Sequence, residues 1–98
     1  MEIRKVNNAG KMTVSISGRV DTTTAPALET ALKESFNECE VLVIDFTDVE
    51  YISSAGLRVL LSAQKVMGKK GGMTLINVSD DIMEIFEVTG FTDILTIE

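Results

Sequence analysis

The first part of the chain carries the alternating pattern of a strand with one buried face. Over Met12–Ser17 every second residue is hydrophobic, and the residues between them are hydroxylic. Ile3 and Val6 indicate a shorter strand before it, and the turn-forming segment Asn7–Gly10 favours a hairpin between the two. We therefore expect a hairpin, followed by a threonine-rich loop at Thr22–Thr24.

Three later segments repeat hydrophobic residues at the spacing of an amphipathic helix. The first starts around Pro26, which suits a first helical turn because an N–H there would have no helical partner. The second runs from about Ala55 to Met67 and is followed by a flexible glycine-rich turn at Gly68–Gly72. The third begins after the N-cap candidate Ser79 and ends at Gly90.

The predicted helices alternate with apolar runs that are typical of strands. Val41–Ile44 is a continuous run, which predicts a central strand that is covered on both faces, has parallel neighbours and ends at Asp45. Residues 73–78 predict another strand, residues 94–97 a short last strand, and residues 47–53 a loop. The expected fold is an α/β layered sandwich with a mixed sheet of four to five strands and three to four helices.

The composition fits a single domain, residues 1–98, and narrows the chemistry. Hydrophobic residues make up 45% of the chain, which is enough for one core. The 15 acidic and 9 basic residues give a net charge of −6, which disfavours nucleic acid and anionic membranes as partners. Because histidine is absent, Ser-His-Asp catalysis, Cys-His catalysis and histidine-based metal sites are excluded.

The single cysteine, Cys39, excludes an intrachain disulfide and a structural zinc site, and favours a reducing compartment. The N-terminal residues do not resemble a signal peptide, and no apolar run approaches the ~20 residues of a membrane span. We expect a cytoplasmic protein without cofactor, metal or enzymatic activity.

One segment in the middle of the chain carries a recognisable signature. Residues 43–61 combine an apolar strand that ends in Asp, a short loop, two serines, the pair Gly56-Leu57 and an amphipathic helix. Gly18 and Asp21 form a Gly-x-x-Asp element before the first helix. Together these features resemble the STAS domain (sulphate transporter and anti-sigma-factor antagonist), whose order of elements matches the predicted one over the whole chain.

The resemblance implies a phosphorylation site at Ser54. In antagonists of this family a partner kinase phosphorylates a serine just before the second helix, and alignment on Gly56-Leu57 puts that serine at Ser54. The family commonly has Asp before this serine and Ser or Thr after it, whereas this chain has Ser53 and Ala55. Ser53 is therefore the second candidate acceptor.

The position of Ser54 also has a purely structural interpretation. At the N-cap its hydroxyl would accept a hydrogen bond from the N–H of Gly56 or Leu57, worth ~1 kcal/mol. A phosphate there would face free N–H groups and the positive end of the helix dipole. We therefore expect phosphorylation to change the surface and leave the fold intact.

The loop before the first helix is a candidate part of a partner-binding surface around Ser54. Family topology implies that Asp21 and the following threonines lie near Ser54, where Asp21 would orient the serine hydroxyl; the alternative is a solvated turn that caps the first helix. The complete set of predicted partner-binding residues is Asp21, Thr22, Thr23, Ser53, Ser54, Ala55, Gly56, Leu57, Arg58 and Leu61.

The second helix has two leucines outside its predicted core stripe. At 100° per residue that stripe consists of Val59, Leu60, Ala63, Val66 and Met67. Leu57 and Leu61 lie four residues apart and stack on each other. They are expected to form a docking ridge rimmed by Arg58 and Lys65, or else to be covered by another element.

The implied function is that of an anti-sigma-factor antagonist, a non-enzymatic partner-switching regulator. Unphosphorylated, it would bind an anti-sigma factor that is a serine-protein kinase; phosphorylation would release it, and a separate serine phosphatase would reset it. One alternative is a constitutive interaction subunit of a transporter or sensory complex. Another is a nucleotide-binding module, although Gly68–Gly72 follows a helix and lacks the pattern of a phosphate loop.

Asp45 ends an apolar strand, as the phospho-acceptor of a receiver domain does. The acidic pair and the later lysine of a receiver are not evident, so a structural role is expected for Asp45. Asp45, Asp48 and Glu50 lack a dense ligand pattern for a divalent cation and are expected to be solvated loop acids.

Overall fold

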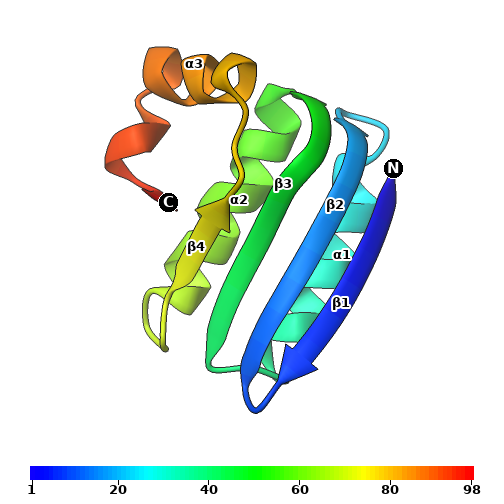
Figure 1. Ribbon diagram of the computed structural model, residues 1–98, viewed down its shortest axis with the longest axis vertical. Coiled ribbons are helices and arrows are strands. Elements are labelled where there is room, and N and C mark those ends of the chain that lie inside the picture. Colours follow the sequence, from blue (N-terminus) through cyan, green and yellow to red (C-terminus); the bar gives the residue numbers. More distant parts are fainter.

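The structure, a computed structural model describing residues 1–98, is built on a mixed sheet with the strand order β1-β2-β3-β4-β5. β1 pairs with β2 in antiparallel fashion, and all later neighbours are parallel. The expected α/β sandwich with a mixed sheet is confirmed (Figure 1). The strands are β1 (Glu2–Asn8), β2 (Lys11–Val20), β3 (Val41–Ile52), β4 (Met73–Ile76) and β5 (Thr96–Ile97).

Three α-helices accompany the sheet: α1 (Ala25–Phe36), α2 (Ser54–Met67) and α3 (Asp80–Thr89). In Figure 1 α1 and α2 lie behind the sheet, and α3 lies beyond the upper end of β4. A short 3-10 helix, Phe91–Asp93, leads from α3 to the last strand. No helix in the chain is both long and apolar enough to cross a membrane.

The hydrophobic side chains of β2 pack into a core between the sheet and the helices. Met12, Val14 and Ile16 are at most 2% exposed and belong to one cluster of 23 buried residues. The opposite face of β2 carries half-buried hydroxyl groups, for example Ser15, and in Figure 1 no helix lies in front of β1 to β3. The predicted central position of Val41–Ile44 between parallel neighbours is confirmed. Leu42, Val43 and Ile44 are all buried, although helices lie behind this part of the sheet only (Figure 1).

β3 is much longer than the sequence predicts, because residues 47–52 continue the strand. The pairing of β2 with β3 contains two register shifts, between Ser15 and Ser17 and between Gly18 and Arg19. Such bulges interrupt the regular alternation of a strand. The buried residues therefore recur at every third position, as Phe46, Val49 and Ile52.

The predicted ends of α3 are confirmed. The Ser79 hydroxyl accepts a hydrogen bond from the Ile82 N–H at 3.3 Å, and Gly90 ends the helix in the left-handed conformation with φ 81°. β4 ends at Ile76, two residues earlier than predicted, because Asn77 has a positive φ of 57°. The last strand contains only Thr96–Ile97.

The glycine-rich turn after α2 is tied to the end of α1. The Lys70 ammonium donates hydrogen bonds to the carbonyl groups of Phe36 and Cys39, and the Gly71 N–H donates to the Glu40 carbonyl at 2.8 Å. Cys39 is buried and its thiol donates to a helix carbonyl at 3.2 Å. Burial raises the pKa of the Cys39 thiol, which keeps it protonated near neutral pH.

Candidate functional site

The site lies where β2 and β3 end and where α1 and α2 begin, at the upper end of the molecule in Figure 1. The Ser53 N–H donates a hydrogen bond to the Val20 carbonyl at 2.8 Å, which holds the start of α2 beside the end of β2. A methyl group on Gly56 would lie only 2.7 Å from side-chain carbons of both Val20 and Ile52. Glycine at this position therefore lets α2 begin close against the two strand ends.

The two serines at this junction have different environments. Ser53 is the N-cap residue, with an extended backbone, but its side chain makes no capping hydrogen bond. Its hydroxyl oxygen is buried without a hydrogen-bond partner. Ser54 is the first residue of α2 and is exposed.

The prediction that Ser54 is the N-cap residue, and accepts a hydrogen bond from Gly56 or Leu57, is wrong. The helix begins one residue earlier than expected, so the capping position falls on Ser53. The exposed position of Ser54 nevertheless leaves its hydroxyl open to solvent at the positive end of the helix. Of the two candidate acceptors, Ser54 is the one that an enzyme can reach.

The Asp21 carboxylate organises the loop before α1. Its Oδ1 accepts hydrogen bonds from the N–H groups of Thr23 at 3.0 Å and Thr24 at 3.1 Å. The Asp21 N–H in turn donates to the Thr24 hydroxyl at 2.9 Å. The hydrogen bond from Thr24, together with that from Thr23, lowers the pKa of Asp21 against the opposing effect of desolvation.

Asp21 makes no hydrogen bond to Ser53 or Ser54, so the interpretation that it orients the serine hydroxyl is wrong in this structure. The alternative is confirmed as a turn, since the Ala25 N–H donates to the Asp21 carbonyl at 2.8 Å, but not as a cap, because the N-cap residue Thr24 makes no side-chain capping hydrogen bond. The physical reason is local: two backbone N–H groups of the same turn are already within reach of the carboxylate.

Arg19 and Tyr51 form the edge of the site on the strands. The Arg19 guanidinium carbon lies 4.4 Å from the centroid of the Tyr51 ring, and its Nε lies 3.9 Å from a carboxylate oxygen of Asp21. The contact links the last residues of β2 and β3, which pair at this position. Arg19 therefore contributes to the shape of the strand ends and the adjoining loop.

A groove of about 240 Å³ separates the first turns of α1 and α2. It brings together three of the predicted partner-binding residues, Thr22, Ala55 and Arg58. Sequence reasoning missed the contribution of α1. The helical spacing of Pro26 and Glu29 on the outer face of the first helix was the available signal, and the complete lining is Thr22, Ala25, Pro26, Glu29, Ala55, Arg58 and Val59.

The predicted docking ridge of two leucines is not on the surface. Leu57 is only 7% exposed and belongs to the core cluster, and Leu61 is half-buried. Val66, which was predicted to be in the core, is 40% exposed. Because α2 contacts α1, β3 and β4, the buried part of its circumference is wider than the predicted core stripe. This buried face includes Leu57 and excludes Val66. Gly56 is buried as well, so it lies beneath the site and is not part of the exposed surface.

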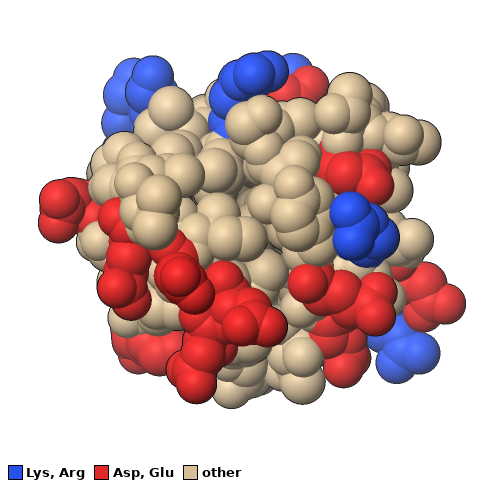
Figure 2. Space-filling view, turned by 90° about the horizontal axis from the view of Figure 1, so that it is seen from above, with Lys and Arg blue, Asp and Glu red and all other residues tan.

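Charge is unevenly distributed at this end of the molecule. Figure 2 looks onto it from above and shows acidic side chains gathered along one half of the surface, with basic side chains mainly along the opposite border. α3 carries four exposed acidic residues and no basic one: Asp80, Asp81, Glu84 and Glu87. Arg58 and Lys65 are exposed on α2.

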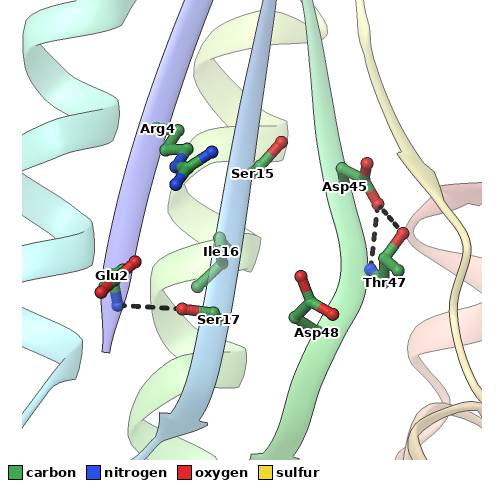
Figure 3. Close-up of a pocket in the computed structure, with 8 residues that line it drawn as sticks. All are labelled: Glu2, Arg4, Ser15, Ile16, Ser17, Asp45, Thr47 and Asp48. Carbon is green, nitrogen blue, oxygen red and sulfur yellow. Dashed lines mark hydrogen bonds between the residues drawn. The ribbon is translucent and has the colours of Figure 1, made fainter.

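A second hollow, of about 350 Å³, lies on the uncovered face of the sheet (Figure 3). Within it Asp45 accepts hydrogen bonds from the Thr47 hydroxyl at 2.6 Å, the Thr47 N–H at 2.9 Å and the Asn77 amide at 3.1 Å. Burial acts to raise the pKa of Asp45, but these hydrogen bonds outweigh it and lower the pKa below its usual value. Asp45 thus links β3 to the segment after β4, which is the structural role expected of it.

Comparison with known proteins identifies the family. The family model described as the STAS domain matches residues 1–98. The anti-sigma-B factor antagonist of Listeria monocytogenes is 33% identical over 96 residues, which cover 96% of this chain and 84% of that protein. The chain therefore belongs to the STAS domain family, as the signature around Gly56-Leu57 predicts.

Solved structures agree with this assignment. The crystal structure of an anti-sigma factor antagonist from Mycobacterium paratuberculosis matches with a TM-score of 0.89 at 29% identity, covering 98% of this chain and 83% of that one. The phosphorylated form of the Bacillus cell fate determinant SpoIIAA matches with a TM-score of 0.75 over 99% of this chain and 91% of that one. Its identity of 12% makes that likeness one of fold.

Proposed function

We propose that this chain is an anti-sigma-factor antagonist that acts by partner switching. With Ser54 unmodified it binds an anti-sigma factor that is also a serine kinase, and phosphorylation of Ser54 releases it. A separate serine phosphatase resets the cycle, and the ATP is bound by the kinase. The observation that carries the proposal is the exposed position of Ser54 as the first residue of α2, next to Ala55, which lines the groove between α1 and α2.

The position of Ser54 explains how a phosphate could act without unfolding the protein. Phosphorylation adds about −1.5 to −2 charges at neutral pH. The first turn of α2 contains no acidic residue, and its first N–H groups have no helical acceptor. A phosphate is therefore compatible with this end of the helix. We expect the phosphate to weaken binding of the partner, because it makes the docking surface bulkier and more negative.

The proposed docking surface is the groove and its border. Thr22, Ala55 and Arg58 line the groove, and Asp21 with Thr23 shapes the adjoining loop. Leu61 contributes a half-buried side chain on α2. Gly56, Leu57 and Ser53 act on this surface indirectly, because they hold the start of α2 in place.

The first test is phosphorylation by the cognate kinase, which is sought among the genes beside this one. The purified chain is incubated with the kinase and ATP and then analysed by peptide mass spectrometry. We expect one phosphate on Ser54, which Ser54→Ala abolishes and Ser53→Ala retains. Phosphate on another residue, or none, would contradict the proposal, and constitutive co-purification with a membrane complex would favour a permanent interaction subunit.

The second test separates binding from folding through Ser54→Asp. We expect the affinity for the anti-sigma factor to fall at least about tenfold, which corresponds to ~1.4 kcal/mol. The melting temperature should stay within roughly 4 °C of the wild type, because an exposed substitution changes stability by about 0.5 kcal/mol. Calorimetric titration and thermal unfolding measure the two quantities. A large fall in melting temperature with unchanged affinity would refute a surface mechanism.

A further inference from the structure

Arg58 follows Ser54 by one helical turn on α2. Residues four apart on a helix are neighbours on its surface, and an anionic residue placed before a cationic one is the favourable order. Arg58 is exposed and takes part in no ion pair. The three ion pairs of the structure are Lys5–Glu34, Arg19–Asp21 and Lys33–Glu29.

Arg58 is also the only cationic residue that lines the groove between α1 and α2. The only acid in that lining is Glu29, which lies across the groove on α1. Glu29 is engaged by Lys33 on its own helix, with 3.6 Å between the Lys33 Nζ and a Glu29 oxygen. The guanidinium of Arg58 is therefore free to pair with a group brought by a partner or attached to Ser54.

We propose that the binding partner of Arg58 depends on whether Ser54 is phosphorylated, an inference that rests on the proposed function. With Ser54 unmodified, the free guanidinium of Arg58 belongs to the docking surface and pairs with an acidic group of the anti-sigma factor. With Ser54 phosphorylated, the phosphate one turn earlier engages the same guanidinium. Arginine suits this exchange, because its planar group binds carboxylates and phosphates through two parallel hydrogen bonds.

Phosphorylation then changes the docking surface twice. It adds negative charge at the start of α2, and it occupies the single cation of the groove. The phosphorylated surface presents the phosphate and Glu29 to an acidic group of the partner, and like charges brought together oppose binding. A serine phosphate alone would supply the first effect, whereas the second depends on the residue at position 58.

The intramolecular pairing is tested by titrating the phosphate itself. Phosphoserine is installed at position 54 by genetic incorporation, so that no kinase is needed, and its phosphorus resonance is followed by NMR against pH. The second ionisation of an exposed phosphoserine lies near pH 6. We expect the midpoint of this ionisation to lie roughly 0.4 pH units lower in the wild type than in Arg58→Gln. This difference corresponds to a pairing free energy of about 0.5 kcal/mol.

Two further variants complete the titration. Arg58→Lys retains the charge and should restore at least about half of the difference, because a lysine at i+4 still attracts the phosphate. Lys65→Gln removes an exposed cation further along α2 and should titrate like the wild type. Identical midpoints in the wild type and Arg58→Gln, or an equal change in Lys65→Gln, would overturn the proposed pairing.

The role of Arg58 in docking is tested with the unphosphorylated protein and the purified anti-sigma factor. We expect Arg58→Gln to weaken binding about fivefold to tenfold, since truncating one member of an interface charge pair is costly. Lys69→Gln, which removes an exposed cation from the turn after α2, should leave binding unchanged. Unchanged affinity in Arg58→Gln would overturn this role. If Ser54 phosphorylation still switches binding in that variant, the proposed function stands while this inference fails. If the kinase never modifies Ser54, the proposed function fails, whatever the phosphate titration gives.

Discussion

Gly56 sets how closely α2 approaches the sheet. A methyl group at this position would lie 2.7 Å from Val20 and Ile52, both β-branched residues that are at most 2% exposed. Such side chains have little freedom to move aside. The Gly-Leu pair of the family signature therefore has a structural explanation: its glycine allows the close contact, and its leucine, Leu57, fills the core beneath the site.

Gly56→Ala is expected to lower the free energy of unfolding by about 1–3 kcal/mol, because overpacking outweighs the ~1 kcal/mol that alanine normally contributes over glycine within a helix. Urea unfolding followed by circular dichroism measures the change. Ser62→Ala, at an exposed position of the same helix, is the matched control and should be neutral or slightly stabilising. A Gly56→Ala protein as stable as the wild type would show that the helix can shift without loss.

The two serines show what burial adds to a residue-level prediction. Ser53 and Ser54 are adjacent and chemically identical, so the sequence leaves either hydroxyl available as an acceptor. Packing at the strand ends buries the oxygen of Ser53 and leaves Ser54 exposed. The distinction depends on Val20, which is distant in sequence and accepts the hydrogen bond from the Ser53 N–H.

The helix α2 shows the limit of a helical wheel at the scale of one element. The wheel gives the angle of each side chain but not the width of the arc that neighbouring elements cover. Because α2 contacts α1, β3 and β4, its buried arc includes Leu57 and excludes Val66. A docking ridge that included Leu57 would require this residue to leave the core.

Leu57→Ala and Leu61→Ala should therefore differ in stability. We expect Leu57→Ala to lower the free energy of unfolding by about 2–4 kcal/mol, as truncation of a core leucine does, and half-buried Leu61 to lose less than about half as much. Denaturant unfolding of the two variants under identical conditions measures both values. Equal stability of the two would mean that Leu57 is not packed as described.

β3 illustrates how irregular pairing hides a strand. Its first residues form a continuous apolar run and are readily predicted. Beyond Asp45 the register shifts against β2 change the spacing of buried residues from two to three, so the same strand resembles a polar loop in sequence. The extension matters for function, because it carries the chain to the point where Ser53 and Ser54 begin α2.

At the scale of the whole molecule, the sheet is stabilised from one side. The continuous core lies between the sheet and the helices, and β3 is the middle strand of the sheet, between β2 and β4. β1 and β5 are edge strands, each paired on one side only, and β5 has only two residues. Stability should therefore decline from the centre of the sheet toward its edges.

Amide hydrogen exchange tests this distribution. We expect the slowest exchange in β2 and β3, at rates that report global unfolding, and faster exchange in β5 and on the unpaired side of β1. Exchange measured by NMR at several pH values resolves the individual amides. If the amides on both sides of β1 were as strongly protected as those of β3, the outer edge of β1 would be covered. That result would contradict the description of β1 as an edge strand.

The surface charge also belongs to this scale. The chain has a net charge of −6, and at the site end of the molecule acidic side chains gather along one half of the surface (Figure 2). This field disfavours polyanions, as the composition alone predicts. It also makes Arg58, the single cationic residue of the groove, the place where an acidic partner group can pair.

The chain's residue pattern alone was enough to place the helices, most of the strands, the caps of α3 and the STAS signature. These features depend on periodicity and on hydrogen bonds between residues that are close in sequence. Tertiary structure alone decided the length of β3, the side of α2 that is buried, the groove that α1 shares with α2, and which serine is exposed. Each of these depends on contacts between distant segments, such as Val20 with Ser53 and Gly56, and no local pattern encodes how closely such segments approach.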